Sequence, residues 1–436
     1  MSSIQIKRDL KAVFGICFGA LVVVTIAVAA IYNSITATAE GAQTISMREI
    51  PRINIELNGI TLEQLNSGDK KTNYYNNSLT VSLDSDISKY NDVTIRGRGN
   101  STWGLPKSPY QIKFNERVDL NGTGATKKWI FLANYLDPTN LRNDLALHYA
   151  EIVGESNVVK GEFAELYING EYVGLYYVCH KIEIDSKVIK LHDQNGILVE
   201  AENLHIEDGA NELVSENGSR FVISETVSDE EEDILTAGED FINAYNFIEK
   251  AVAERDFETF IKYADLDSFV QYYLISEFTI NPDAYCTSFH LYKNGTNDKI
   301  HAGPVWDFDY ALANDQWVWN DEYRDNLDPY GLLFGSAPDQ ETTIQTLFFD
   351  LMKMPQFREY VNQYYRERIL GHKNELLVYY DSRVRQIEKK AVRNNQVFNL
   401  GDFYENAFSL RKWLSTRYDF LDQTFGNNDI INTEIY

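Results

Sequence analysis

Three aspartates in the middle of the chain have the spacing of a site for phosphoryl transfer. Asp283 follows an apolar segment typical of a buried helix, and Asp307 and Asp309 follow a predicted β-hairpin with strands over residues 288–293 and 299–305. Because a hairpin places its outer ends side by side, we expect Asp283 and Asp307 to be neighbours. Converging carboxylates repel unless a cation neutralises them. In phosphoryl transfer one aspartate accepts the hydroxyl proton and another holds the metal on the phosphates. Aspartates at strand ends are also common without such a role.

A glycine-rich loop upstream has the composition of a phosphate-binding turn. Arg98, Gly99 and Asn100 lie in RGRGNSTWG, and loops with so little side-chain bulk let backbone N–H groups approach phosphates. The loop matches neither the Walker sequence nor GxGxxG, so an ordinary tight turn stays open. Lys107 and Lys113 follow it. Lys113 lies in the alternating strand YQIKF, where it can reach nucleotide phosphates, as the third-strand lysine of protein kinases does, or can be a solvated strand lysine.

The segments that must position these residues are predicted to be short strands at first. INIEL and LTVSL alternate between apolar and polar residues, and DVTIRG and YQIKF flank the glycine-rich loop. FAELYING and EYVGLYYV form a hairpin in which Asn169-Gly170 supplies the positive φ of a tight turn. A helix is predicted before that hairpin, from Asp137-Pro138 to Gly154.

The second half of the chain has helical periodicity. Residues 205–233 are predicted to be an acidic excursion with one strand, RFVIS. From Glu239, FINAYNFIEKAVAE and LDSFVQYYLISEFTI carry apolar residues at three- and four-residue intervals. Residues 343–425 continue as helix. Strands first and helices later predict an α+β fold, with a β-rich lobe over about 51–200 and a mainly helical lobe over 239–436.

The N-terminus is predicted to anchor the chain in a membrane. Residues 12–32 form an uncharged apolar run of the length a helix needs to cross a bilayer. The basic residues within 1–11 are expected to stay cytoplasmic, which places a polar tether over 33–50 and the domain 51–436 outside the cell. A cleaved signal peptide and a buried helix are the alternatives.

Composition excludes some classes of partner and site. The net charge of −25 argues against a nucleic-acid partner, because phosphate binding needs concentrated Lys and Arg. The three cysteines, one of them in the apolar run, do not make a disulfide scaffold, although Cys179 and Cys286 can pair. No CxxC or His-rich spacing indicates a zinc site.

Several sequence blocks, taken in order, resemble the spore coat protein CotH kinase family. They are IRGRGNSTWGLPKSPYQIKF, KKWIFLANYLDPTNLRNDLALHYA, GEYVGLYYVCHKIE, NPDAYCTSFHLY and PVWDFDYAL. The resemblance runs from about residue 51 to at least residue 370. It implies an atypical protein-kinase-like fold that binds ATP with Mg²⁺ or Mn²⁺ and phosphorylates protein Ser/Thr. By position, Asp283 resembles the catalytic aspartate, Asp307 and Asp309 the metal-binding aspartates, and Lys113 the nucleotide lysine.

The chain departs from the kinase pattern at two positions. Ser288 stands where kinases place a metal-binding asparagine, and His180, with Glu183 nearby, stands where related sequences often carry glutamate. Glu151 and Glu165 are both possible partners for Lys113.

Two functions therefore remain. One is a membrane-anchored kinase that acts on a protein substrate at the cell surface, as in a spore coat. The other is an inactive carbohydrate-binding or adhesion module that uses exposed Tyr and Trp side chains, for which Trp103, Trp129 and Trp306 are candidates.

Overall fold

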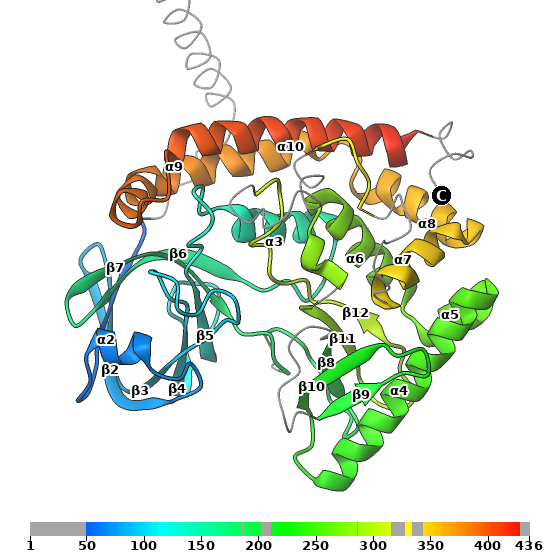
Figure 1. The fold of residues 1–436 in the computed structure, drawn as a ribbon, viewed down its shortest axis with the longest axis horizontal. Coiled ribbons are helices and arrows are strands. Elements are labelled where there is room, and N and C mark those ends of the chain that lie inside the picture. The colour runs from blue at the N-terminus through cyan, green and yellow to red at the C-terminus, as the bar shows by residue number, and fades with distance from the viewer. Residues whose placement is uncertain are drawn as a thin grey trace, which may run out of the picture. The chain divides into compact units, whose positions relative to one another are not determined.

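The computed structural model describes residues 49–184, 187–201, 211–285, 287–314, 328–333 and 343–427. Residues from Glu49 onward form one compact unit. The predicted membrane helix at 12–32 and most of the tether lie outside the described residues. Within the described ranges, no helix has both the length and the apolar character needed to cross a membrane. The predicted α+β class is confirmed, with a β-rich N-terminal part and a helical C-terminal part (Figure 1).

The N-terminal part is a closed barrel in the order β1-β2-β3-β4-β5-β7-β6. Its strands are β1 (Arg52–Glu56), β2 (Tyr74–Leu83), β3 (Asp86–Gly97), β4 (Tyr110–Val118), β5 (Thr126–Leu132), β6 (Gly161–Ile168) and β7 (Glu171–His180). Neighbours pair antiparallel, except that β6 pairs parallel with β1 and closes the barrel. The short helix α2 (Leu62–Ser67) begins with a capping box formed by Thr61 and Gln64.

Strand alternation decides which side chains enter the barrel. Ile95 on β3, Ile112 on β4 and Trp129 on β5 are fully buried in one apolar cluster. Because successive residues point to opposite faces, Arg96 and Lys113 lie on the outer face of the barrel.

A second sheet packs against helices of the C-terminal part, in the order β12-β11-β8-β10-β9. Its strands are β8 (Ile197–Ala201), β9 (Glu212–Val214), β10 (Arg220–Thr226), β11 (Phe289–Lys293) and β12 (His301–Ala302). The predicted hairpin is therefore β11–β12, with β8 paired to its other side. The acidic excursion contains two strands, β9 and β10, where one was expected.

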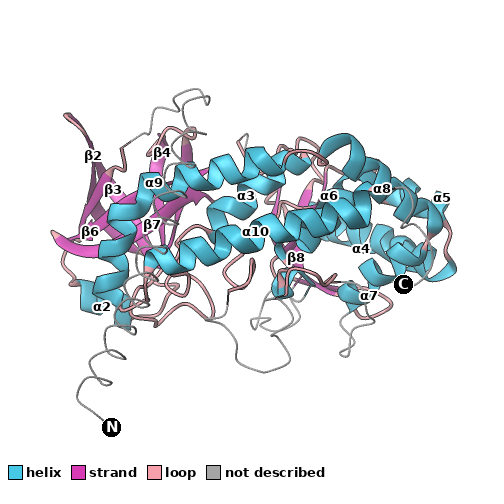
Figure 2. Cartoon of the chain, turned by 90° about the horizontal axis from the view of Figure 1, so that it is seen from above, coloured by secondary structure: helices cyan, strands magenta, loops and turns pink. Residues whose placement is uncertain are grey.

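The described helices of the C-terminal part are α3 (Arg142–Val153), α4 (Glu231–Glu254), α5 (Phe257–Tyr263), α6 (Leu266–Thr279), α7 (Thr343–Lys353), α8 (Pro355–Arg368), α9 (Lys373–Phe398) and α10 (Phe403–Gly426). The long helices α9 and α10 run side by side, and α9 also contacts β7 of the barrel (Figures 1 and 2). Ion pairs strengthen this contact, because Lys390 lies 2.5 Å and Arg393 3.3 Å from the Glu165 carboxylate on β6.

Two predicted helix starts differ from the structure. Helix α4 begins at Glu231, within the acidic run, instead of near Glu239. Helix α3 begins at Arg142 instead of Asp137-Pro138. The Asp137 carboxylate accepts hydrogen bonds from the backbone N–H groups of Thr139 and Arg142, both at 2.9 Å, and so forms a turn before the helix.

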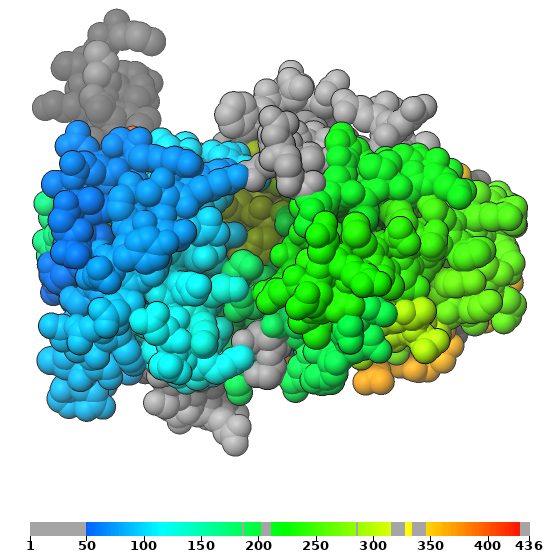
Figure 3. Space-filling view, turned by 90° about the horizontal axis from the view of Figure 1, so that it is seen from below, coloured from blue at the N-terminus to red at the C-terminus, as the bar shows by residue number. Residues whose placement is uncertain are grey.

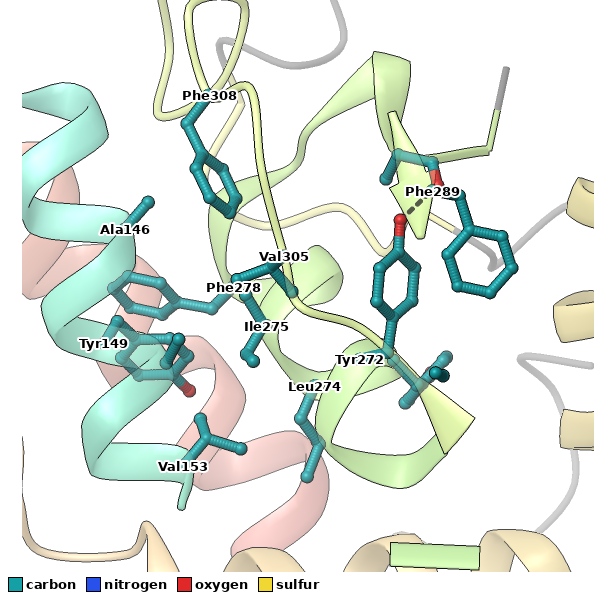
Figure 4. Packing of buried hydrophobic residues seen from close by; sticks show 14 of the residues in the cluster. Ala146, Tyr149, Val153, Tyr272, Leu274, Ile275, Phe278, Phe289, Val305 and Phe308 are labelled. Atoms are coloured by element: carbon teal, nitrogen blue, oxygen red, sulfur yellow. Dashed lines mark hydrogen bonds between the residues drawn. The ribbon is translucent and has the colours of Figure 1, made fainter. Parts of the chain in front are cut away.

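The apolar core beneath the second sheet packs α3 against α6 (Figure 4). Tyr149 of α3 stacks on Phe278 of α6 with ring centroids 3.7 Å apart. Val305 and Phe308, each 3% exposed, anchor the segment after β12 in the same core. This packing fixes the backbone on both sides of Asp307.

Candidate active site

A cavity of about 320 Å³ lies between the barrel and the helical part. From the barrel side it is lined by the loop after β3 and by the residues that follow β5. From the other side it is lined by Glu200 of β8, the 3-10 turn η1 (Pro282–Tyr285) and the segments before β11 and after β12. Figure 3 shows a hollow between the barrel, in blue and cyan, and the green elements.

Seven of the nine predicted site residues line this one cavity. They are Arg98, Gly99, Asn100, Asp283, Ser288, Asp307 and Asp309. The hairpin argument for Asp283 and Asp307 thus holds in the structure, because η1 enters β11 and the Asp307 segment leaves β12.

The Asp307 backbone is held by side chains from the other end of the hairpin. Asn281, just before η1, donates from Nδ2 to the Asp307 carbonyl oxygen at 3.0 Å. The Ser288 hydroxyl donates to Asp307 Oδ2 at 3.4 Å. Asp307 has a φ of 63°, a left-handed conformation that is rare for a non-glycine residue and clusters at functional sites.

Asp309 is held by helix α3. Asn143 donates from Nδ2 to Asp309 Oδ1 at 2.6 Å, and its own Oδ1 accepts the Phe308 backbone N–H at 3.0 Å. Arg142, ion-paired with Asp137, also donates to the carbonyl oxygens of Leu312 and Ala313. Helix α3 therefore positions the whole segment that carries the two aspartates.

The electrostatics of the two aspartates favour a bound cation. Burial raises the pKa of Asp307, and burial together with the Asp307 charge raises the pKa of Asp309 to about 7. The Arg98 guanidinium opposes both effects without cancelling them. Among the described residues no group of three His, Cys, Asp or Glu side chains has the geometry of a metal cage. The pair fits an ion such as Mg²⁺, which takes one or two carboxylates and completes its shell with phosphate oxygens and water.

The glycine-rich loop forms the opposite wall of the cavity. Gly99 has a φ of +86°, and a β-carbon there would lie 2.3 Å from the Thr102 hydroxyl oxygen, so glycine is required. The Arg98 guanidinium lies 5.4 Å from the centroid of the Trp306 ring. Lys70 donates from Nζ to the Gly99 carbonyl at 2.9 Å and to Asn100 Oδ1 at 2.6 Å.

The structure does not bring the two predicted lysines into the cavity. Lys107 is 1% exposed, and its Nζ donates to the carbonyl oxygens of Ala133 and Leu175, both at 2.5 Å. Lys107 therefore links the residue that follows β5 to the middle of β7 inside the protein. Lys113 is exposed on the outer face of β4, because Ile112 and Phe114 occupy the barrel interior. The expected partners of Lys113 also lie elsewhere: Glu151 pairs with Lys160, and Glu165 with α9.

Other singled-out residues have structural roles. His180 lies against Trp129 with ring centroids 4.9 Å apart, and Glu183 pairs with Lys128 at 2.5 Å. Trp129 is fully buried, so it cannot belong to an exposed aromatic row. Cys179 is a buried free thiol, and Cys286 lies outside the described residues.

The sequence did not indicate that Asn143, Asn281, Glu200 and Lys70 take part in this site. Asn143 stands between Arg142 and Asp144 in the first turn of α3, so its sequence context gave no signal that its amide would be buried. Nothing local to Lys70 indicates its contact with a loop 29 residues away.

Comparison with known proteins places this geometry in a family. The family model described as CotH kinase protein matches residues 95–421. The inner spore coat protein H of Bacillus subtilis (strain 168) is 24% identical over 231 residues, which cover 51% of this chain and 60% of that protein. The match therefore spans less than two thirds of the relative's length. Because the family model covers most of the chain, including the glycine-rich loop and all three aspartates, the chain belongs to the CotH kinase protein family.

Proposed function

We propose that this protein is a kinase that transfers the γ-phosphoryl group of ATP to Ser/Thr hydroxyls of a protein, with Mg²⁺ or Mn²⁺. The observation that carries the proposal is the convergence of Asp283, Asp307 and Asp309 with the Arg98–Asn100 loop on one cavity. Family membership supports it, since the model that matches the chain is described as a kinase.

Each residue has a role that follows from its place. The Asp283 carboxylate accepts the proton of the substrate hydroxyl. The substrate oxygen forms a bond to the γ-phosphorus while the bond from that phosphorus to the ADP oxygen breaks. Asp307 and Asp309 hold the divalent ion, which when bound neutralises charge on the phosphate oxygens. Arg98 and the N–H groups at Gly99 and Asn100 contact the phosphates.

The balance of charge makes nucleotide binding dependent on metal. Among the residues that line the cavity, Arg98 is the one Lys or Arg, facing Glu200, Asp283, Asp307 and Asp309. Without a cation, the negative charge of a triphosphate in this cavity is repelled by the carboxylates that line it, which disfavours binding. We therefore expect ATP alone to bind poorly and ATP with Mn²⁺ or Mg²⁺ to bind well.

The proposed location rests on the N-terminal sequence and on the name of the relative. The apolar segment 12–32 is proposed to hold the domain at a membrane, with residues 51–436 outside. The relative is a spore coat protein by name, so a protein acceptor at a cell surface or coat is the proposed substrate. That location requires a supply of nucleotide outside the cytoplasm.

A phosphate-transfer assay tests the proposal. The purified protein with γ-labelled ATP and Mn²⁺ should label a protein acceptor, and Asp283→Ala and Asp307→Ala should each abolish labelling. An adhesion module on the same fold would instead bind glycans, and that binding would survive both substitutions. Glycan binding of this kind together with no labelling would replace the kinase proposal.

A further inference from the structure

A buried amide joins three parts of the cavity wall. Asn143, in the first turn of α3, is 4% exposed. Its Nδ2 donates to Asp309 Oδ1 at 2.6 Å and to Asn134 Oδ1, on the barrel side, at 3.1 Å. Its Oδ1 accepts the backbone N–H of Phe308 at 3.0 Å. Both amide hydrogens and the carbonyl oxygen are thus used, so the amide has a single orientation.

This orientation determines what Asp309 offers to the cavity. Oδ1 is occupied by Asn143, while Oδ2 receives no hydrogen bond from any residue in the described ranges. The bond from the Phe308 N–H to Asn143 holds the backbone between Asp307 and Asp309 in place. The carboxylate therefore has one anchored oxygen and one oxygen left for an external ligand.

A neutral donor suits this position better than a charged one. Asp309 lies beside Asp307, and both residues are half-buried at the cavity. A lysine or arginine at residue 143 would form an ion pair with Asp309 and compete with a bound cation. An amide orients the carboxylate and leaves its charge available.

We infer that Asn143 is the positioning residue that presents Asp309 Oδ2 to a divalent cation. The inference rests on the proposed function, because it gives the aspartate pair a metal to hold. Hydrogen-bond partners of metal ligands change metal affinity by about 10- to 100-fold when removed. Loss of the Asn143 amide should weaken Mn²⁺ binding within that range, even without nucleotide.

The experiment measures Mn²⁺ binding directly on the nucleotide-free protein, by electron paramagnetic resonance of the free ion. Asn143→Leu removes all three hydrogen bonds, and Asn143→Ser is a smaller change that loses the reach to Asp309. The matched control is Asn77→Leu in the barrel. Asn77 is 1% exposed, donates to the carbonyls of Tyr74 and Val93 at 2.7 and 2.9 Å, and accepts the Asn58 N–H at 2.9 Å.

The expected result separates positioning from stability. Asn143→Leu and Asn77→Leu should both lower the melting temperature without metal. Only the Asn143 variants should raise the Kd for Mn²⁺, by about tenfold or more. Asn143 variants that bind Mn²⁺ within twofold of wild type would overturn the inference. Mn²⁺ binding by the wild-type protein in the same experiment would still support the proposed metal site. If wild type binds no Mn²⁺ with or without ATP, the proposed function fails and the inference fails with it.

Discussion

Replacing Asp309 by asparagine should make the metal-free protein more stable, because this half-buried carboxylate lies beside a second one, that of Asp307. The pKa of Asp309 is raised from 3.8 to about 7, first by burial and then by the Asp307 charge. Asparagine keeps an oxygen for the hydrogen bond from Asn143 and removes the charge. Catalytic and ligand-binding groups often reduce stability in this way.

The sign and size follow from linkage. The folded protein holds the Asp309 proton more tightly than the unfolded chain does. Its stabilisation is therefore complete below about pH 4 and is lost as the pH rises through about 7. At about 1.4 kcal/mol for each pH unit, the loss at pH 8 is about 4 kcal/mol. With about 2.1 cal/mol/K per residue over a unit of this size, that free energy corresponds to about 5 °C in melting temperature.

The assay is thermal unfolding in EDTA at several pH values. Asp309→Asn should melt about 2 °C above wild type at pH 5 and about 5 °C above it at pH 8. Asp229→Asn, at an exposed position, is the control and should change the free energy of unfolding by less than about 0.5 kcal/mol. Saturating Mn²⁺ should stabilise wild type alone and reduce the difference. A variant no more stable than wild type at pH 8, or a difference independent of pH, would refute this reasoning.

Three further predictions concern charged side chains outside the aspartate pair. Arg98→Ala should weaken binding of ATP with Mn²⁺ by about tenfold or more, as loss of a hydrogen bond to a charged group does. Lys113→Ala should weaken it less, since Lys113 does not line the cavity. Equal effects of the two substitutions in calorimetry would contradict the placement of the site. Lys107→Met leaves two buried carbonyls without their donor, so urea unfolding should show a loss of about 1–3 kcal/mol, with nucleotide affinity affected less than by Arg98→Ala. Arg383 Nε lies 2.8 Å from the Asp144 carboxylate, and both side chains are buried. Arg383→Met leaves this carboxylate without its charge partner, which should cost about 3–5 kcal/mol in the same unfolding assay. A cost below about 1 kcal/mol would contradict a buried ion pair.

The elements with strong local patterns could be predicted from the sequence. Asn169-Gly170 gives the tight turn between β6 and β7, and both residues have positive φ. The hairpin β11–β12 brings Asp283 and Asp307 to one cavity because its geometry is set by neighbouring residues. Spacing therefore predicted that these two aspartates lie near each other, whereas their roles came from the resemblance to the family.

The contacts that complete the fold and the site join distant segments and leave no local signal. The barrel closes through the parallel pairing of Ile53 with Leu166, more than a hundred residues away. Asn143 reaches Asp309 across 166 residues. Lys107 was predicted to contact nucleotide because it follows the glycine-rich loop, yet its ammonium group is buried and donates to the carbonyl oxygens of Ala133, just after β5, and Leu175 of β7. Long-range packing of this kind overrides local composition.

Calorimetric binding of ATP to wild type and to Asp307→Ala, with and without Mn²⁺, tests the metal–nucleotide site most directly. We expect wild type to bind ATP only when Mn²⁺ is present. Asp307→Ala should remain folded, with circular dichroism like that of wild type, and lose this metal-dependent binding. Binding of ATP by the variant with unchanged affinity, or no binding by wild type in Mn²⁺, would contradict the assignment of the cavity as a metal–nucleotide site.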